Sequence, residues 1–227
     1  AVRDASNGKY FATCVEEATS HLLTILSGHE EAKGIAAGLL TDPSLSDQDN
    51  FLACDLGGGS LELVLVEDRS AKATASLPLG AVRLTERFIS HPQDPVPYVE
   101  TEAISKQVSQ TLGESEFPFP EATPFLVATG GSFYTARVIL ANREGISFDK
   151  RSTLARSDFS NLLEETVSLS LEERHQRFPD LPPNRADVMA AAFTCIIALL
   201  DHLKASEALN SLRNLRYGIA AELLAQS

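Results

Sequence analysis

The spacing of apolar residues changes character along the chain. Apolar positions three and four residues apart predict helices over 8–26, 30–40, 101–112 and 133–142. Short apolar runs bounded by turn-forming residues predict strands over 51–54, 61–67, 71–77 and 125–128. From residue 157 onward the pattern is helical, with a long apolar helix over 186–203 and a last helix over 215–224. Strands come first and helices follow, which predicts a mixed α and β protein without the strict βαβ alternation of a dinucleotide-binding fold.

Composition narrows the classes of ligand and compartment. The 227 residues are 44% apolar, enough to bury a sizeable core in one large domain or two small ones. A net charge of −12 excludes bulk binding of nucleic acid or of an anionic membrane, so an anionic ligand needs a local site. No apolar run approaches the roughly 20 residues that span a membrane. The three cysteines form no Cys-x-x-Cys pair, which predicts reduced thiols in a cytoplasmic protein.

The turn Asp55-Leu56-Gly57-Gly58-Gly59-Ser60 lies between two predicted strands. Consecutive glycines allow the backbone to approach a ligand closely, and successive N–H groups in such a turn form an anion-binding nest. The Ser60 hydroxyl adds a donor. Asp55, at the end of the strand, is placed to hold a divalent cation or a water beside the phosphate, and the expected cation is Mg²⁺, which binds through one or two carboxylates together with phosphate oxygens. Glu62, two residues past Ser60, could face the same cleft. The alternative reading is a glycine-rich hairpin turn with solvated charges.

Two further segments are compatible with phosphate chemistry. Gly130, Gly131 and Ser132 open the predicted helix 133–142, and a helix N-terminus with free N–H groups suits an anion. An ordinary strand-to-helix turn is the alternative. Glu30 and Glu31 follow a Ser-Gly turn, where either carboxylate could act as a general base. Acidic residues are also common at helix starts for dipole reasons alone, so spacing does not choose between these readings.

The chain contains neither a Gly-x-Ser-x-Gly elbow nor a Walker motif, which excludes serine-hydrolase and P-loop mechanisms.

Seven segments together are typical of one protein family. They are Val2-Arg3-Asp4-Ala5 with Asn7, Ser27-Gly28 with Glu30-Glu31-Ala32, Asp55-Leu56-Gly57-Gly58-Gly59-Ser60 with Glu62-Leu63, Leu77-Pro78-Leu79-Gly80-Ala81-Val82-Arg83-Leu84, Gly130-Gly131-Ser132, Arg185-Ala186-Asp187-Val188 and Leu215-Arg216-Tyr217-Gly218. In these segments, the chain resembles the exopolyphosphatase / guanosine pentaphosphate phosphohydrolase (Ppx/GppA) family. The resemblance implies an actin-like ATPase or ribonuclease H-like fold of mixed α and β structure. Residues 1–34 are then the C-terminal remnant of the N-terminal domain, and residues 35–227 form the second domain.

The resemblance also implies roles that spacing does not assign. Glu31 matches the family's catalytic base for the attacking water, and Asp55 and Glu62 match acidic residues that position magnesium or that water. The segment from Gly57 to Ser60 matches one of two phosphate-binding loops. The remaining matches are cleft residues that contact phosphate: Arg3, Arg185, Gly130, Gly131 and Ser132.

The function that the resemblance implies is hydrolysis of the terminal phosphate of polyphosphate or of the 5′ phosphate of guanosine pentaphosphate. Water attacks, Mg²⁺ assists, and a homodimer is the assembly that the family suggests. One alternative is a nucleotide-dependent kinase or ATPase of the same superfold. Another is a non-catalytic domain that binds polyphosphate or a guanosine alarmone. The choice between polyphosphate and guanosine pentaphosphate stays open at this point.

Two departures from the family pattern bear on activity. The family opens with a hairpin of the form Asp-x-Gly-Ser-Asn-Ser, which supplies a second phosphate loop, and this sequence does not contain it. Leu61 stands where the family usually has threonine.

We therefore expect the 227-residue polypeptide, assayed by itself, to show little or no polyphosphatase activity. Phosphoryl transfer depends on positioning and charge stabilisation, and half of the phosphate donors would be missing. Phosphate release from long polyphosphate with magnesium is the measurement. Turnover comparable to that of an intact homologue would contradict the expectation.

Overall fold

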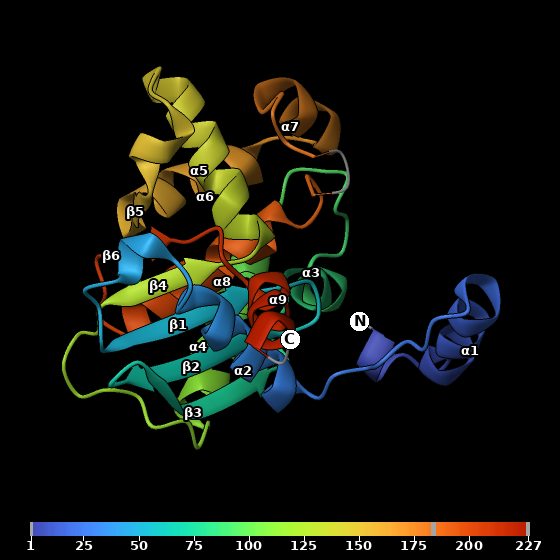
Figure 1. The fold of residues 1–227 in the computed structure, drawn as a ribbon. Helices are drawn as coiled ribbons and strands as arrows, with labels where there is room; N and C mark the ends of the chain where they lie inside the picture. The colour runs from blue at the N-terminus through green and yellow to red at the C-terminus, as the bar shows by residue number, and fades with distance from the viewer. Residues whose placement is uncertain (1, 183–184, 226–227) are drawn as a thin grey trace.

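The computed structural model describes residues 2–182 and 185–225, and a mixed β-sheet lies at the centre of the described chain (Figure 1). Its six strands are β1 Phe51–Leu56, β2 Leu61–Glu67, β3 Ser70–Leu77, β4 Leu126–Thr129, β5 Thr153–Ala155 and β6 Glu207–Asn210. The strand order is β3-β2-β1-β4-β6-β5. Strands β1, β2 and β3 form antiparallel hairpins, β1, β4 and β6 run parallel, and β5 pairs antiparallel with β6.

Helices cover both faces of this sheet. The α-helices are α1 Gly8–Thr19, α2 Gly28–Leu39, α3 Ala81–Phe88, α4 Tyr98–Gly113, α5 Gly131–Glu144, α6 Arg156–Ser168, α7 Leu171–Arg177, α8 Met189–His202 and α9 Leu215–Ala225. Short 3₁₀ helices are η1 Val2–Asp4, η2 Pro43–Leu45 and η3 Phe148–Arg151. Helices α2 and α9 pack together over one face, and α4 and α8 lie over the other (Figure 1). All of these helices within the described residues fall short of the length and apolar character of a membrane span.

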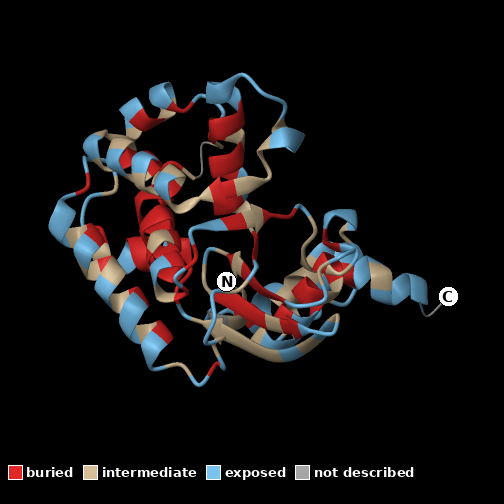
Figure 2. Cartoon of the chain, turned by 90° about the vertical axis from the view of Figure 1, so that its left-hand side faces the viewer, coloured by how far each residue is buried: buried red, intermediate tan, exposed pale blue. Residues whose placement is uncertain are grey.

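Strand β1 separates two hydrophobic cores. Leu52, Cys54 and Leu56 belong to the larger core with α4 and α8, whereas Phe51 and Ala53 belong to the smaller core with α2. Successive side chains of a strand point to opposite faces, so burial on both faces explains the continuous apolar run in the sequence. Figure 2 shows buried residues along the central strands and in the helices packed against them, with exposed residues mostly on the outer faces of the helices and in loops.

The structure confirms the first four predicted strands and corrects the C-terminal part. β6 lies in the region expected to be helical throughout, and the helix expected over 186–203 begins only at Met189. The sequence of β6, Glu-Ala-Leu-Asn, contains no β-branched residue, so its strand conformation depends on pairing with β4 and β5 rather than on propensity. The helix expected over 8–26 ends at Thr19, where Ser20 adopts a left-handed conformation.

The N-terminal segment extends away from the body (Figure 1). Its apolar side chains Tyr10, Phe11 and Leu22 are exposed. The predicted domain boundary after residue 34 lies inside α2, and Ala32 before the boundary is as fully buried as Leu39 after it. Helix α2 therefore packs on the sheet along both of its halves.

Small residues allow α2 and α9 to approach closely. A Cβ atom on Gly218 would lie 1.9 Å from the Gly34 carbonyl oxygen, and one on Gly38 would lie 2.1 Å from the Asn214 carbonyl oxygen. Distances this short require the two backbones to separate, so side chains larger than hydrogen are excluded at the crossing. The crossing holds the start of α9, with Arg216, against the helix that contains Glu31.

Gly218→Ala should therefore lower the free energy of unfolding by about 1–3 kcal/mol, the usual cost of overpacking a tight contact. Gly113→Ala is the matched control, because a Cβ there meets nothing within 4 Å, and it should leave stability unchanged or slightly higher. Chemical denaturation of both variants measures the difference. Equal stability of the two variants would show that the crossing is not tight.

Candidate functional site

A row of polar side chains crosses four neighbouring strands near one end of the sheet. In the strand register, Ser76 on β3 lies opposite Glu62 on β2, Glu62 lies opposite Asp55 on β1, and Asp55 lies beside Thr129 on β4. Alternation along β1 places Asp55 on the same face as Ala53, the face covered by α2. Glu62 and Thr129 are only 2% exposed, so this row is set into the protein rather than on its surface.

Two hydroxyl groups fix the Glu62 carboxylate. Ser60 Oγ donates to Glu62 Oε1 at 2.5 Å, and Ser76 Oγ donates to the same oxygen at 2.8 Å. Burial raises the pKa of Glu62, and these two hydrogen bonds oppose that rise. The Ser60 hydroxyl proton is thus directed to Glu62, which leaves the Ser60 backbone N–H as its donor toward a ligand.

Asp55 is placed where a negative charge is costly. Burial, followed by repulsion from Glu62 and Glu31, raises the pKa of Asp55 to about 7. Within the described residues, no group of three or more His, Cys, Asp or Glu side chains is arranged to hold a metal ion. The two facing carboxylates nevertheless fit Mg²⁺, which commonly uses one or two carboxylates and completes its shell with water and substrate phosphate.

The carbonyls of the glycine loop are held by α3. The carbonyls of Gly57 and Gly58 accept hydrogen bonds of 2.9–3.1 Å from the first three amides of α3, and Gly59 O accepts one of 2.8 Å from Arg83 Nε. Across the part of the chain that the structure describes, the N–H groups of Gly58, Gly59 and Ser60 make no hydrogen bond. Three adjacent N–H groups without a hydrogen-bond partner are the kind of donors from which an anion-binding nest is built, so the structure is compatible with the predicted phosphate loop.

The second loop meets the first at Asp55. Gly130 has φ +101°, and a Cβ atom there would lie 2.5 Å from Asp55 Oδ1, so both conformation and contact require glycine. A Cβ on Gly131 would lie 2.2 Å from the guanidinium carbon of Arg185, which therefore rests against the N-terminus of α5. Ser132 is buried at the base of this helix.

The structure separates the two adjacent glutamates at the start of α2. Glu30 forms a capping box with Ser27, accepting its N–H at 2.7 Å, and this hydrogen bonding lowers the pKa of Glu30. Glu31 instead forms an ion pair of 3.0 Å with Arg3. Arg3 also donates to Ser76 Oγ at 3.4 Å, which brings Glu31 and Arg3 to the polar row.

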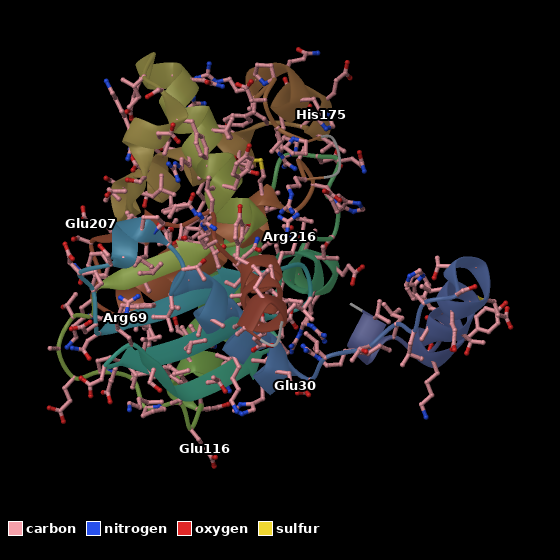
Figure 3. All side chains as sticks on the ribbon, in the orientation of Figure 1. Glu30, Arg69, Glu116, His175, Glu207 and Arg216 are labelled. Atoms are coloured by element: carbon pink, nitrogen blue, oxygen red, sulfur yellow. The ribbon has the colours of Figure 1, made fainter. Side chains whose placement is uncertain are left out.

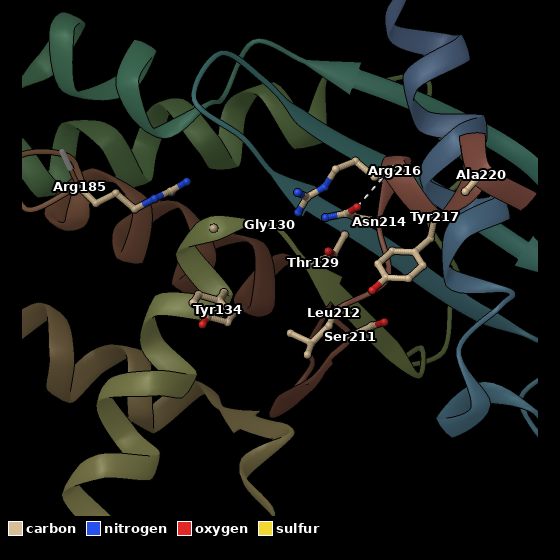
Figure 4. Close-up of a pocket in the computed structure, with 11 residues that line it drawn as sticks. Thr129, Gly130, Tyr134, Arg185, Ser211, Leu212, Asn214, Arg216, Tyr217 and Ala220 are labelled. Carbon is tan, nitrogen blue, oxygen red and sulfur yellow. Dashed lines mark hydrogen bonds between the residues drawn. The ribbon is translucent and has the colours of Figure 1, made fainter. Parts of the chain in front are cut away.

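Two cavities flank the row of carboxylates. The smaller cavity, of about 410 Å³, lies beside the glycine loop. It is lined by Arg3, Gly28, Gly59, Ser60, Ser76, Leu77, Pro78 and Arg83. A larger cavity of about 700 Å³ lies beside the second loop, between β4, α5 and α9. Arg185 and Arg216 extend toward Gly130 from two sides of it, and Tyr134 and Tyr217 line its walls (Figure 4).

Sequence reasoning missed Ser76 and Tyr134. Ser76 lies in an alternating strand with no unusual motif, and only its pairing with Glu62 reveals its position. Tyr134 belongs to no sequence motif. It lies three residues after Gly131, in the first turn of α5, and lines the larger cavity. A signal for Ser76 was available in principle, because aligning the predicted strands over 61–67 and 71–77 across a short turn places it near Glu62.

Comparison with known proteins decides the family. A model of the Ppx/GppA phosphatase family matches residues 1–227, the whole chain. The chain belongs to the Ppx/GppA phosphatase family. This membership agrees with the order of motifs along the sequence.

Two curated proteins are similar to parts of this chain. Over 205 residues, the chain is 27% identical to a bifunctional 3-dehydroquinate synthase/phosphatase of Fusobacterium nucleatum, and the matched region covers 89% of this chain and 30% of that protein. The chain is 33% identical over 89 residues to a guanosine-5′-triphosphate,3′-diphosphate pyrophosphatase of Pseudoalteromonas atlantica, covering 39% of this chain and 17% of that protein. The chain thus spans less than a third of each of these relatives.

Solved structures of Ppx/GppA proteins share the fold. An exopolyphosphatase from Cytophaga hutchinsonii superimposes with a TM-score of 0.85 at 24% identity, covering 99% of this chain and 72% of that one. The Aquifex aeolicus family member superimposes with a TM-score of 0.78 at 23% identity, covering 100% of this chain and 72% of that one. The actin-like ATPase fold expected from the sequence is confirmed.

The raised pKa of Asp55 leads to a prediction for stability. Folded Asp55 keeps its proton up to about pH 7, whereas an unfolded aspartate loses it near its ordinary value of 3.8. The folded state therefore binds more protons in this window, and stability falls as pH rises through it. Asp55→Asn should remove this loss, so that in metal-free buffer the variant melts at a higher temperature than the parent at pH 8.

Melting temperature measured from pH 4 to pH 8 in the presence of a chelator checks this prediction. Asp47→Asn, at an exposed loop position, should follow the parent at every pH. Parallel curves for Asp55→Asn and the parent would contradict a raised pKa at Asp55.

Proposed function

We propose that the protein containing this chain hydrolyses a terminal phosphoanhydride bond, releasing phosphate from inorganic polyphosphate or from the 5′ end of guanosine pentaphosphate. The observation that supports it is the meeting of the amide nest of the glycine loop with the facing carboxylates Asp55 and Glu62 at one end of the sheet. Donors for phosphate and ligands for a cation are then adjacent. Membership of the Ppx/GppA phosphatase family supports the same reaction class.

The glycine loop binds the terminal phosphate in this proposal. The N–H groups of Gly58, Gly59 and Ser60, which make no hydrogen bond within the described residues, donate to phosphoryl oxygens. The loop is held before substrate arrives, because its carbonyls are already bound by α3 and Arg83. Donors that are fixed in advance stabilise charge on the transferred group without reorganising during the reaction.

Asp55 and Glu62 are the proposed ligands of Mg²⁺. A bound divalent ion would neutralise charge on the phosphate and on its leaving group. Without such an ion, burial raises the pKa of Asp55 most, and repulsion from Glu62 and Glu31 raises it further. Ser60 and Ser76 hold Glu62 in one orientation, so the pair is arranged before an ion binds.

Glu31 is the proposed general base. Its carboxylate takes a proton from water, the water oxygen bonds to the terminal phosphorus, and the bridging P–O bond breaks toward the shortened chain. The ion pair with Arg3 at 3.0 Å keeps Glu31 beside the polar row. Glu30 is excluded from this role by its capping box with Ser27.

The larger cavity receives the rest of the substrate in this proposal. Arg185 lies against the N-terminus of α5, and Arg216 enters from the start of α9 (Figure 4). Guanidinium groups bind phosphate oxygens in pairs, so these two suit the phosphates that follow the terminal one. The cavity volume of about 700 Å³ has room for several such groups.

Glu31→Gln in the protein that contains this chain should lower kcat by about 10²–10⁴-fold, because the amide cannot accept the proton from water. The apparent affinity for polyphosphate should change little. Glu30→Gln is the matched control at the neighbouring position, and it should keep kcat within about twofold while losing some stability from the cap. Phosphate release and substrate binding are measured for both. Similar kcat values for the two variants would rule out Glu31 as the base.

A further inference from the structure

Ser76 lies between two groups of the site that belong to different parts of the chain. It stands on β3, faces α2 and lines the cavity of about 410 Å³ together with Ser60 and Arg3. On one side is Glu62 in the neighbouring strand, and on the other are Arg3 and Glu31 from the N-terminal segment and α2.

The direction of the hydrogen bonds at Ser76 follows from the chemistry of its neighbours. A guanidinium only donates and an ionised carboxylate only accepts. Ser76 Oγ therefore accepts from Arg3 Nη2 at 3.4 Å and gives its single proton to Glu62 Oε1 at 2.8 Å. The hydroxyl has no proton left for a phosphate, so its effect on a bound substrate passes through its neighbours.

We propose that Ser76 is a positioning residue, whose hydroxyl holds the Glu62 carboxylate and connects it to the Arg3–Glu31 ion pair. The connection runs from Ser60 in the phosphate loop through Glu62 and Ser76 to Arg3 and Glu31. It joins the loop, the proposed metal ligand and the proposed base. The kinetic consequence rests on the proposed function, whereas the orientation of Glu62 does not.

The geometry around Glu62 shows why two hydroxyls are needed. Both Ser60 and Ser76 donate to Oε1, and within residues 2–182 and 185–225 no hydrogen bond reaches Oε2. Oε1 is thereby fixed by the protein, which leaves Oε2 as the oxygen able to bind a cation. Removing one donor leaves Oε1 with a single hydrogen bond and allows the carboxylate to turn.

The size of residue 76 is limited by helix α2. A Cβ atom on Gly28 would lie 2.5 Å from Ser76 Cβ, so the first turn of α2 touches this side chain. A substitution that changes volume would therefore confuse steric and hydrogen-bonding effects. Threonine and valine have nearly the same shape, and only threonine has the hydroxyl, so the difference between these two variants reports the hydrogen bonds alone.

The test compares Ser76→Thr with Ser76→Val in the protein that contains this chain. With sodium polyphosphate and with guanosine pentaphosphate, each in the presence of MgCl₂, kcat of the valine variant should be at least about tenfold below that of the threonine variant. KM should agree within about twofold. Ser70→Ala, at the exposed start of the same strand, is the control and should match the parent. In calorimetric titration with MgCl₂ alone, the valine variant should bind Mg²⁺ at least about fivefold more weakly than the threonine variant.

The outcomes separate this inference from the proposed function. Equal kcat and equal Mg²⁺ affinity of the two variants, with an active parent, would overturn the role of Ser76 and leave the proposed hydrolysis standing. A parent that releases no phosphate from either substrate would contradict the proposed hydrolysis, and the titration would then decide Ser76. In that case weaker Mg²⁺ binding by the valine variant supports the role, and equal binding, or no binding by the parent, overturns it.

Discussion

The pairing register of β1 with β2 and β4 is the constraint on which the site depends. Both faces of β1 are buried, with Leu52, Cys54 and Leu56 in one core and Phe51 and Ala53 in the other. A slip of one residue would exchange these faces and place every side chain in the wrong core. The apolar residues thus determine where Asp55 lies, and its carboxylate meets Glu62 and Thr129 as a consequence of core packing.

This arrangement has a cost that the surroundings offset. Asp55 and Glu62 are acidic groups set opposite each other, and burial raises the pKa of both. Repulsion from Glu31 adds to the rise at both, and repulsion from Glu62 adds to it at Asp55. A site that keeps such a pair is less stable than an apolar one of the same shape. The hydroxyls of Ser60 and Ser76 recover part of the cost at Glu62, and the continuous core below the row supplies the stability that the row itself does not.

Local features of the site were predictable from sequence, and contacts between distant segments were not. The loop from Gly57 to Ser60 was recognised because glycines between two apolar strands are a local pattern. β6 was missed because its four residues have weak strand propensity and depend on neighbours more than 50 positions away. For the same reason, spacing alone did not distinguish Glu31 from Glu30: the distinction lies in Arg3, 28 positions earlier, and in the capping box with Ser27.

Charge explains why the site is built from backbone groups and a carboxylate pair. The chain has a net charge of −12. Side chains that end in oxygen or nitrogen atoms are spread over the body and the N-terminal segment (Figure 3). A polyanion approaching such a surface meets a repulsive field, so attraction must be strong and local. On the proposed function, the amides of the glycine loop and the guanidinium groups of Arg185 and Arg216 provide part of this attraction. Asp55 and Glu62 would repel the same ligand on their own, so on the proposed function a divalent cation between them and the phosphate turns that repulsion into binding. On this proposal an acidic protein recognises a polyanion only together with a metal ion, and substrate affinity is therefore linked to the cation concentration.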